Sequence, residues 1–595
     1  MITEVPEFVT GVEIFKDRKY KYPNFQRAYS WETEQIDTFL DDLLTKSLKN
    51  DYYLGTIYYI KGSNEVIHII DGQQRITTLF LLINAIRMVN EKKYLTLNIK
   101  MIDENNEAIF DSASATPFSR ILFSGTIVEI ERQFRRENSI NLTKMQMLIN
   151  QKYINKKVED NVHFYTNNIK KILNNIKFLF LNCEDLATSS TIFENINSKG
   201  LKLNNTDIIK NAYFSRIDTL ESTDDFESRK YNLWLSIENH IFNKDNLHSL
   251  DLDSSYVKQK TTKFKSNLES IFVIYYQLKY NSKYVKTNYN LANTYIYNME
   301  KIKIDTSDAL LLELSEINDL AKASKYIFNS NETVPGVEVN NIQRVFNFFD
   351  LLGIKVHYPL SIAVYYNILI KNKFKQELQQ LEKIFEKLAL FHFIYNSVSS
   401  SLPSKPEKAY MRIASNLYLN QLSYNELEKE IVDNFFSNNY NFNEIEIYNK
   451  FDHMLFTLDR KKEIKKSIDN VTMKEYKMFD SSNEIKYIYE LLEKKLRDDH
   501  SHSIAIESVE HINNFNEMNI DYKSFKVGNL LPLEKELNKL CENQKVQEKI
   551  LYYKQSRYML VKEFVNIYEK NNSNWYEEWL KYLSHLFIVA ITDKK

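Results

Sequence analysis

Hydrophobic positions change from strand spacing to helix spacing around residue 72. The mostly apolar run 66–70 is typical of a buried strand, and residues 53–60 form a second strand-like run. A Gly-Ser-Asn turn at 62–64 separates the two runs, so together they predict a β-hairpin. Apolar residues then recur at helical spacing: Ile76, Leu79, Phe80, Ile83 and Ile86. A helix that starts near residues 73–75 is therefore expected directly after the turn Asp71-Gly72.

Similar patterns predict the other elements of the first 215 residues. A helix is expected after Trp31-Glu32, with one apolar face made by Ile36, Phe39, Leu40 and Leu43. Runs 95–101 and 176–181 are strand-like, while the mixed polar section 103–175 is predicted to be helical. Residues 191–200 are expected to form a short helix that ends at Gly200. Asn205 or Thr206 is expected to cap the next helix.

From residue 215 to residue 498 the pattern is helical. Helical spacing is clearest in four segments: 310–320, 346–354, 378–393 and 485–496. Gly353 and Pro359 bracket one break, and the Ser- and Pro-containing stretch 397–406 predicts a loop. Two lysine-rich clusters, at 258–265 and 460–466, suit either DNA phosphates or a solvated helix face.

The pattern changes again near the C-terminal end. Residues 506–512 predict a strand, 527–533 a turn and a strand, and 534–541 a helix. We therefore expect three domains: an α/β domain over 1–215, an all-α middle region over 216–498, and an α+β domain over 499–595.

Composition narrows the class of protein. The 595 residues include 43% hydrophobic and 26% charged residues, which is ordinary for a globular protein, and the length calls for several domains. The formal net charge of −1 excludes a global basic field, so any contact with nucleic acid must be local. Two distant cysteines argue against a disulfide framework or a zinc ribbon. With no signal-peptide pattern and no apolar run of membrane-span length, we expect a cytoplasmic protein without a membrane partner.

The turn at Asp71-Gly72 carries the first candidate chemistry. A strand, a glycine turn and a helix N-terminus direct free backbone N–H groups and the positive end of the helix dipole to one spot, which suits an anion. Arg75 adds a cationic fork that suits phosphate oxygens, and Gln73 and Gln74 add amide groups. Asp71 is a candidate ligand for Mg²⁺, or a residue that only caps the turn. The alternative is a plain turn beside a surface arginine.

Two polar segments flank this turn in the sequence. Residues 22–31 combine aromatic side chains with a Gln-Arg pair, which suits stacking on a base and gripping its phosphate, or else a peripheral aromatic cluster. The segment 195–211 is rich in Asn, Lys and Asp, and it suits either a site or a solvated face.

The predicted C-terminal strands and helix carry the second set of candidate functional residues. An acid and a histidine side by side in a strand, an Asn after a Gly, and an Asn on the following helix form the layout of an HNH (ββα-metal) nuclease. In this layout His511 is the general base for a water molecule, and Asn529 holds the loop and orients His511. One divalent cation, Mg²⁺ or Mn²⁺, stabilises the charge on the leaving oxygen. The alternative is an ordinary strand histidine in a degenerate domain.

Four ordered blocks give a family resemblance for the N-terminal region. They are Phe25-Gln26-Arg27-Ala28-Tyr29-x-Trp31, Leu54-Gly55, Ile70-Asp71-Gly72-Gln73-Gln74-Arg75-Ile76-Thr77-Thr78-Leu79, and the segment from Phe193 through Ile196-Asn197, Gly200, Leu203 and Asp207 to Lys210-Asn211. Over roughly residues 5–214 the chain resembles the N-terminal domain of the GmrSD family, which comprises prokaryotic type IV, modification-dependent restriction enzymes and related anti-phage proteins.

The resemblance implies a fold and a set of site residues. The fold is similar to that of ParB and sulfiredoxin, in which a Gly-x-x-Arg turn holds nucleotide phosphates. It implies an NTP site, with GTP, UTP, CTP and ATP not distinguished, made by Asp71, Gly72, Gln73, Gln74, Arg75 and Thr77. We further expect that modified DNA is sensed by Phe25, Gln26, Arg27, Tyr29 and Trp31. The N-terminal site is expected to be supported by Asn197, Lys199, Asp207 and Lys210.

The C-terminal end resembles the nuclease domain of the same family, which carries Glu-His-Ile, then Gly-Asn-Leu, then Asn and Lys. The matching residues are Glu510-His511-Ile512, Gly528-Asn529-Leu530, Asn538 and Lys554. The resemblance implies that Glu510 and Asn538 face the metal, that His511 is the base, and that Lys554 meets a phosphate. One departure is that the family's proline two residues past Ile is replaced by Asn514.

Together these patterns predict an anti-phage defence protein that cuts or nicks DNA under the control of a nucleotide. The expected partners are a nucleotide and DNA, including modified phage DNA. A homo-oligomer or companion defence proteins are further candidate partners. The alternative from another class is an NTP-hydrolysing, DNA-binding or partner-binding module whose C-terminal domain does not cleave. A toxin-like nuclease that acts on RNA or host DNA is a third reading.

Overall fold

The computed structural model groups the chain into two compact units. One contains residues 1–277 and 282–324, and the other contains residues 278–281 and 325–595, so the predicted helical middle region contributes to both. The structure describes residues 6–16, 18–22, 29–62, 66–103, 108–112, 118–136, 142–183, 205–218, 224–242, 254–280, 306–328, 340–393, 395, 404–419, 421–436, 444–458, 460, 462, 464–465, 476–479, 482–497, 505–513 and 521–592.

The first unit contains a mixed six-stranded sheet in the order β1-β6-β3-β4-β2-β5. Its strands are β1 (Glu7–Thr10), β2 (Lys19–Tyr22), β3 (Tyr52–Lys61), β4 (Val66–Asp71), β5 (Phe110–Ser112) and β6 (Ile176–Asn182). The predicted hairpin is confirmed, because β3 and β4 pair antiparallel. The predicted strand at 176–181 is also confirmed, and it pairs parallel with β3.

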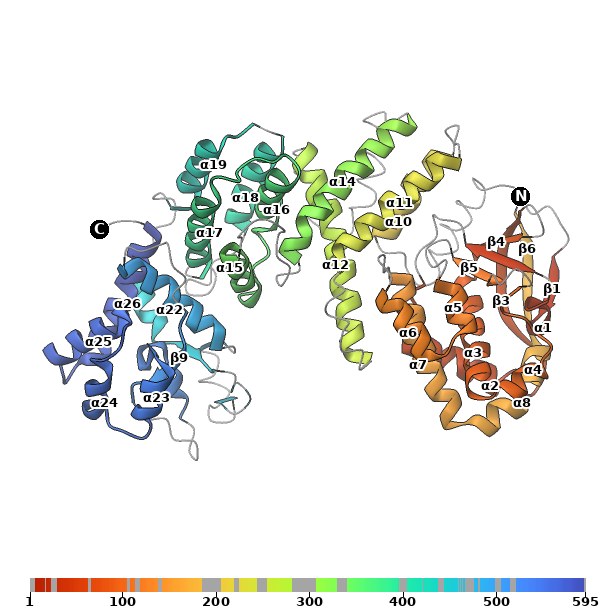
Figure 1. Cartoon of the computed structure of the whole chain (residues 1–595), viewed down its shortest axis with the longest axis horizontal. Helices are drawn as coiled ribbons and strands as arrows, with labels where there is room; N and C mark the ends of the chain where they lie inside the picture. The colour runs from red at the N-terminus through yellow and green to blue at the C-terminus, as the bar shows by residue number, and fades with distance from the viewer. Residues whose placement is uncertain are drawn as a thin grey trace. The chain divides into compact units, whose positions relative to one another are not determined.

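Helices accompany this sheet, and Figure 1 shows them gathered beside the strands in the red and orange part of the chain. They are α1 (Gly11–Ile14), α2 (Thr33–Thr45), α3 (Gln73–Val89), α4 (Glu91–Leu95), α5 (Phe118–Ser124), α6 (Ile127–Arg136), α7 (Leu142–Asp160) and α8 (Val162–Asn175). Helix α3 is buried along its whole length from Ile76 to Ile86 and packs against α7. Phe80 on α3 lies at the centre of an aromatic cluster that includes Phe15, Phe110 and Phe123.

One further N-terminal prediction is wrong, and a second falls outside the described residues. The run 95–101 is not a strand: α4 ends at Leu95, and Asn98 has a φ of 52°, which extended backbone does not allow. Leu97, Ile99 and Met101 are nevertheless buried. The alternating pattern of apolar residues therefore indicated burial correctly, although the segment is not a strand. The helix expected at 191–200 lies outside the described residues.

The rest of the first unit is helical. Its helices are α10 (Asn205–Asp218), α11 (Asp224–Ile241), α12 (Ser254–Tyr280) and α14 (Ser307–Phe328), the last two of which extend into the second unit. The helix predicted after Asn205 is confirmed as α10.

The second unit begins with helices, as the sequence predicts. They are α15 (Asn340–Leu351), α16 (Tyr358–Leu369), α17 (Leu378–His392), α18 (Ser404–Tyr418), α19 (Tyr424–Ile431), the π-helical turn Val432–Phe436, α20 (Glu444–Phe451) and α22 (Ser482–Arg497). The break between Gly353 and Pro359 is confirmed, because α15 ends before Gly353, which has a φ of 67°, and Pro359 lies in the first turn of α16. The predicted loop 397–406 is too long, since α18 starts at Ser404.

Two small β-pairs complete this unit. Strands β7 (Met454–Phe456) and β8 (Lys477–Phe479) pair parallel and were not predicted. Strands β9 (Ser508–His511) and β10 (Leu530–Leu533) pair antiparallel and precede α23 (Lys535–Cys541), α24 (Val546–Tyr553), α25 (Met559–Lys570) and α26 (Trp575–Thr592). The predicted order of strand, strand and helix is confirmed. Among the helices that the structure describes, none is long and apolar enough to cross a membrane.

Candidate functional site

The turn between β4 and α3 is built around Gly72. This residue is the N-cap of α3 and has a φ of 94°, a left-handed conformation that favours glycine. A β-carbon at this position would lie 2.2 Å from Cδ1 of Ile57 on β3, so the turn packs directly on the neighbouring strand. The helix therefore starts against the sheet, with its first backbone amides at the end of β4.

Arg75 turns back from the first turn of α3 towards β3. Its Nη1 donates to the carbonyl oxygen of Leu54 at 3.2 Å, and its Nη2 donates to that of Thr56 at 3.0 Å. Nη2 also lies 3.6 Å from Oδ2 of Asp71, and both side chains keep part of their surface exposed, 25% for Arg75 and 19% for Asp71. The guanidinium is thus held over the strand by backbone carbonyls, next to the Asp71 carboxylate.

The other predicted nucleotide-binding side chains are buried. Gln73, Gln74 and Thr77 are at most 6% exposed. Oγ1 of Thr77 donates to the carbonyl oxygen of Gln73 at 2.7 Å, and the hydroxyl of Tyr22 donates to the same oxygen at 3.2 Å. These contacts stabilise the first turns of α3 from the inside, so Asp71 and Arg75 are the predicted site residues with part of their side chains open to a ligand.

Gln74 joins this turn to the end of the aromatic segment. Its Oε1 accepts hydrogen bonds from the backbone N–H of Ser30 at 2.9 Å and of Trp31 at 3.2 Å. The buried hydroxyl of Tyr29 bonds to Oγ1 of Thr78 at 2.8 Å. The carbonyl oxygen of Trp31 accepts from Nδ2 of Asn150 at 2.7 Å. The described end of the aromatic segment is therefore anchored on α3 and α7.

The remaining predicted sensing and supporting residues are placed in part. Phe25, Gln26, Arg27, Asn197 and Lys199 lie outside the described residues. Asp207 and Lys210 lie on α10.

Lys210 is buried inside the helical part of this unit. Its Nζ lies 5.7 Å from the ring centroid of Phe214 and 5.8 Å from that of Trp234. Burial lowers the pKa of Lys210, and the charges of Glu238 and Asp207 oppose that shift. Lys210 therefore lies in the interior between α10 and α11.

The second predicted site lies on one hairpin and one helix. Glu510 and His511 are the last residues of β9, and His511 pairs with Leu530, the first residue of β10. Asn529 comes immediately before β10, and Asn538 lies on α23, which packs against β9. The structure thus places four of the five predicted catalytic residues on the β9–β10 hairpin and α23.

Asn529 fixes the chain that follows His511. Its Oδ1 accepts from the backbone N–H of Asn513 at 2.9 Å, and its Nδ2 donates to the carbonyl oxygen of Ser524 at 3.0 Å. The backbone N–H of Ile512 donates to the carbonyl oxygen of Asn529 at 2.8 Å. Asn529 is buried, so these bonds replace contacts with water and hold the loop in place.

The side chain of Asn538 contacts the other end of β9. Its Nδ2 donates to Oγ of Ser508 at 2.9 Å and to the carbonyl oxygen of Val509 at 3.2 Å. These bonds tie α23 to the strand that carries Glu510 and His511.

Glu510 has a partner that sequence reasoning missed. Nζ of Lys549, on α24, lies 2.6 Å from Oε1 of Glu510, and it also donates to the carbonyl oxygen of His511 at 2.6 Å. Both side chains are less than 10% exposed. Burial raises the pKa of Glu510, while the charge of Lys549 opposes that shift. One sequence signal was available: Lys549 lies beside Ile550 and four residues before Tyr553, on the apolar face of its helix.

His511 lies mostly out of solvent. Its ring packs edge-on against Phe525, with centroids 5.1 Å apart. Burial lowers the pKa of His511 to about 4, and the positive charges of Lys549 and Arg460 add to this effect. The imidazole is therefore neutral near pH 7, the state in which a histidine accepts a proton.

Lys554, the sequence candidate for phosphate binding, is exposed at the surface. It follows the end of α24, and its Nζ pairs with Oε1 of Glu569 at 2.6 Å, with both side chains about half exposed. Lys549 is therefore the lysine that reaches Glu510 and His511.

Each of the predicted metal ligands, Glu510 and Asn538, has a protein partner in this structure. Oε1 of Glu510 is bonded to Lys549, and the amide nitrogen of Asn538 is bonded to β9. Across the described ranges, no group of three or more His, Cys, Asp or Glu side chains could hold a metal ion. The need for Mg²⁺ or Mn²⁺ stays a prediction.

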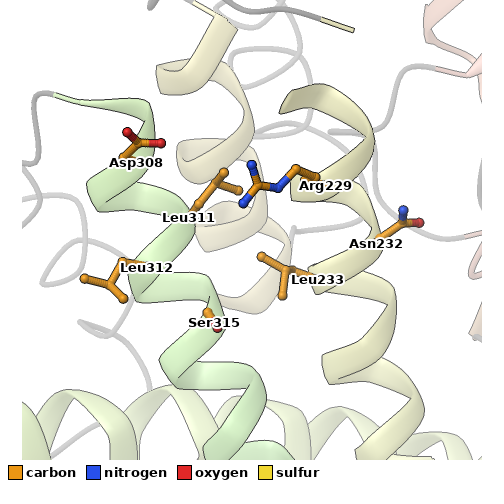
Figure 2. Close-up of a pocket in the computed structure, with 7 residues that line it drawn as sticks. All are labelled: Arg229, Asn232, Leu233, Asp308, Leu311, Leu312 and Ser315. Atoms are coloured by element: carbon orange, nitrogen blue, oxygen red, sulfur yellow. The ribbon is translucent and has the colours of Figure 1, made fainter. Parts of the chain in front are cut away.

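A separate pocket of about 560 Å³ lies between α11 and α14 of the first unit. Figure 2 shows Arg229 and Leu233 on α11 pointing towards α14, which contributes Leu311 and Ser315, while Asn232 and Leu312 point away. Arg229 and Asp308 are exposed at its rim. The residues that line this pocket include none of the predicted site residues.

Comparison with known proteins bears on the N-terminal region. Residues 12–214 match the sequence model of a family described as the N-terminal domain of the GmrSD restriction endonuclease. No curated protein matches the chain. The match contains strands β2 to β6, the turn at Gly72 and most of α10, so the resemblance read from the four sequence blocks is confirmed for this region. Over residues 12–214, the chain carries a GmrSD-type N-terminal domain.

Proposed function

We propose that the chain is a restriction-type nuclease of anti-phage defence that acts on DNA. The observation that carries this proposal is the match of residues 12–214 to the N-terminal domain of a restriction endonuclease family. The arrangement of Glu510, His511, Asn529 and Asn538 on β9, β10 and α23 supports a hydrolytic site in the second unit.

His511 is the proposed general base. As a neutral imidazole it takes a proton from water, and the resulting hydroxide attacks the phosphorus of a phosphodiester. The bond to the leaving oxygen breaks, and that oxygen takes a proton. Asn529 keeps the loop after His511 in place during this step. We keep Mg²⁺ or Mn²⁺ as a requirement to be tested, and no step here passes through the metal.

The proposed nucleotide site is the N-terminus of α3. Backbone amides of the first turn and the guanidinium of Arg75 favour phosphate oxygens, and Asp71 lies beside them. The link from Gln74 to Ser30 and Trp31 supports coupling between nucleotide binding and the sensing segment. In the proposed sensing step, the aromatic side chains contact an extruded modified base or a modified DNA backbone.

A cleavage assay tests the nuclease. Wild type, His511→Ala and His453→Ala are incubated with unmodified, glucosylated-hydroxymethylated and phosphorothioated DNA, with Mg²⁺, Mn²⁺ or EDTA, and with each NTP. Loss of the base is expected to slow cleavage by about 10²–10⁴-fold. The exposed His453, which bonds to the carbonyl oxygen of Asn449, is the matched control and is expected to leave cleavage unchanged.

The buried Lys549–Glu510 pair favours the alternative function. If Glu510 is held for structure alone, the C-terminal domain docks on DNA or a partner, and the N-terminal domain binds or hydrolyses NTP. Purified protein that binds DNA and hydrolyses NTP, but leaves every substrate intact with Mg²⁺ or Mn²⁺, would support this alternative and reject the nuclease.

A further inference from the structure

Lys549 contacts two neighbouring residues of β9 by different means. Its ammonium bonds to the side chain of Glu510 and to the main-chain carbonyl of His511, each at 2.6 Å. The first bond holds a carboxylate, and the second holds the peptide that carries the imidazole. One cation therefore fixes the strand at the point where the proposed base leaves it.

Both charged groups of this contact are buried. The side chain of Lys549 is 3% exposed and that of Glu510 is 8% exposed. A charge is retained at such depth only when it is paired and hydrogen-bonded, because its desolvation is costly. The ammonium has three donors, and two of them are directed at β9.

The surroundings restrict how β9 could move. Asn529 holds the chain after His511, and Asn538 holds Val509 before Glu510. Between these two points, Lys549 supplies a hydrogen bond to the peptide of His511 from outside the sheet. The imidazole itself packs against Phe525, so a small shift of the peptide would move the ring.

We propose that Lys549 is a positioning residue, which holds the Glu510–His511 segment of β9 so that the imidazole of His511 faces the reacting phosphate. This inference rests on the proposed nuclease function for its effect on rate. Its structural part, the placement of the His511 ring, can be measured without cleavage.

The test uses a series of substitutions in the full chain. Lys549→Met removes the donors and the charge, Lys549→Gln keeps a donor, and Lys549→Arg keeps both. Lys581→Met is the matched control, because that lysine is in an exposed pair with Glu578. Calorimetric unfolding identifies the variants that fold.

Two quantities are measured for each folded variant. The first is kcat and KM for DNA cleavage, and the second is the NMR signal of the ¹³C-labelled His511 imidazole, assigned by its loss in His511→Asn. We expect Lys549→Met to lower kcat at least tenfold with KM within twofold, and to displace the His511 signal. The displacement is expected to fall in the order Met, Gln, Arg, with Lys581→Met identical to wild type.

The outcomes separate the two proposals. A wild-type protein that never cleaves DNA rejects the nuclease, and the His511 signal still decides the placement. An unchanged His511 signal in a folded Lys549→Met or Lys549→Gln variant overturns the positioning role, whatever the cleavage rate. A displaced signal with unchanged kcat overturns it as well.

Discussion

Gly55 lies directly beneath the guanidinium of Arg75. A β-carbon at Gly55 would fall 1.5 Å from Nη1 of Arg75 and 2.8 Å from Cζ. Because Gly55 has no side chain, Arg75 can reach the carbonyl oxygens of Leu54 and Thr56. Glycine is scarce in this chain, with 9 in 595 residues, and this one makes room for a proposed phosphate ligand.

Gly55 has a φ of 131°, so Gly55→Ala is expected to strain β3 as well as to displace Arg75, whose far end can swing away. Nucleotide binding, measured by calorimetric titration, is expected to weaken as much as in Arg75→Ala. Gly353→Ala is the matched control: Gly353 also has positive φ, at 67°, but a β-carbon there meets nothing within 4 Å. It is expected to cost about 1 kcal/mol in stability and leave nucleotide binding unchanged. Equal binding by Gly55→Ala and wild type would contradict the Arg75 site.

Gln74→Leu is expected to release the end of the aromatic segment. The backbone amides of Ser30 and Trp31 would lose their acceptor, at a cost of about 1–3 kcal/mol. Hydrogen exchange at residues 30–31 is expected to become faster. Gln35→Leu is the control, since Oε1 of Gln35 accepts from the backbone N–H of Glu32 at 2.9 Å. Unchanged exchange at Ser30 and Trp31 would reject this anchoring role.

The pH dependence of stability follows from His511. Its pKa is lowered from 6.5 to about 4 by burial, so between these values the unfolded chain binds more protons than the folded one. The protein therefore loses stability as pH falls from about 6.5 towards 4, by up to about 3 kcal/mol from this residue. His511→Asn is expected to lose less over the same range in calorimetric scans. Parallel curves for the two proteins would contradict the low pKa.

Gly528 and Tyr576 are expected to be coupled. A β-carbon at Gly528 would lie 2.8–3.0 Å from the ring and hydroxyl of Tyr576, whose hydroxyl donates to Asp452 at 2.7 Å. Gly528→Ala is therefore expected to destabilise the second unit by about 1–3 kcal/mol through overpacking. In a Tyr576→Ala background the same change is expected to cost little, because the ring is gone. Additive effects of the two substitutions would show that the contact does not limit packing.

The sequence was most informative where local chemistry and hydrophobic spacing agreed. The hairpin, the turn at Gly72 and the start of α3 were predicted because a buried strand, a glycine turn and a helical repeat follow one another. The order of β9, β10 and α23 was predicted for the same reason. Alternation failed at 95–101, where Asn98 takes positive φ and the chain buries apolar residues without pairing.

The hydrophobic pattern of the sequence did not predict contacts between residues that are far apart in the chain. Lys549 lies 39 residues from Glu510, and nothing local distinguishes it from the exposed Lys554 except its place on an apolar helix face. The strands β1, β2 and β5 are four, four and three residues long, too short for a periodic signal. Gln74, a predicted nucleotide-binding residue, also bonds to a segment more than 40 residues earlier, and local spacing gives no sign of this contact.

The place of β6 in the sheet has a consequence during synthesis. This strand is the last of the six in the sequence, yet it lies between β1 and β3 and pairs with both. Until residue 182 has left the ribosome, β1 has no strand to pair with and β3 has only β4. At about 5–20 residues per second, the nascent domain waits several seconds with an open edge. A nascent chain that pauses before residue 176 thus presents an unfinished sheet to chaperones or to other chains.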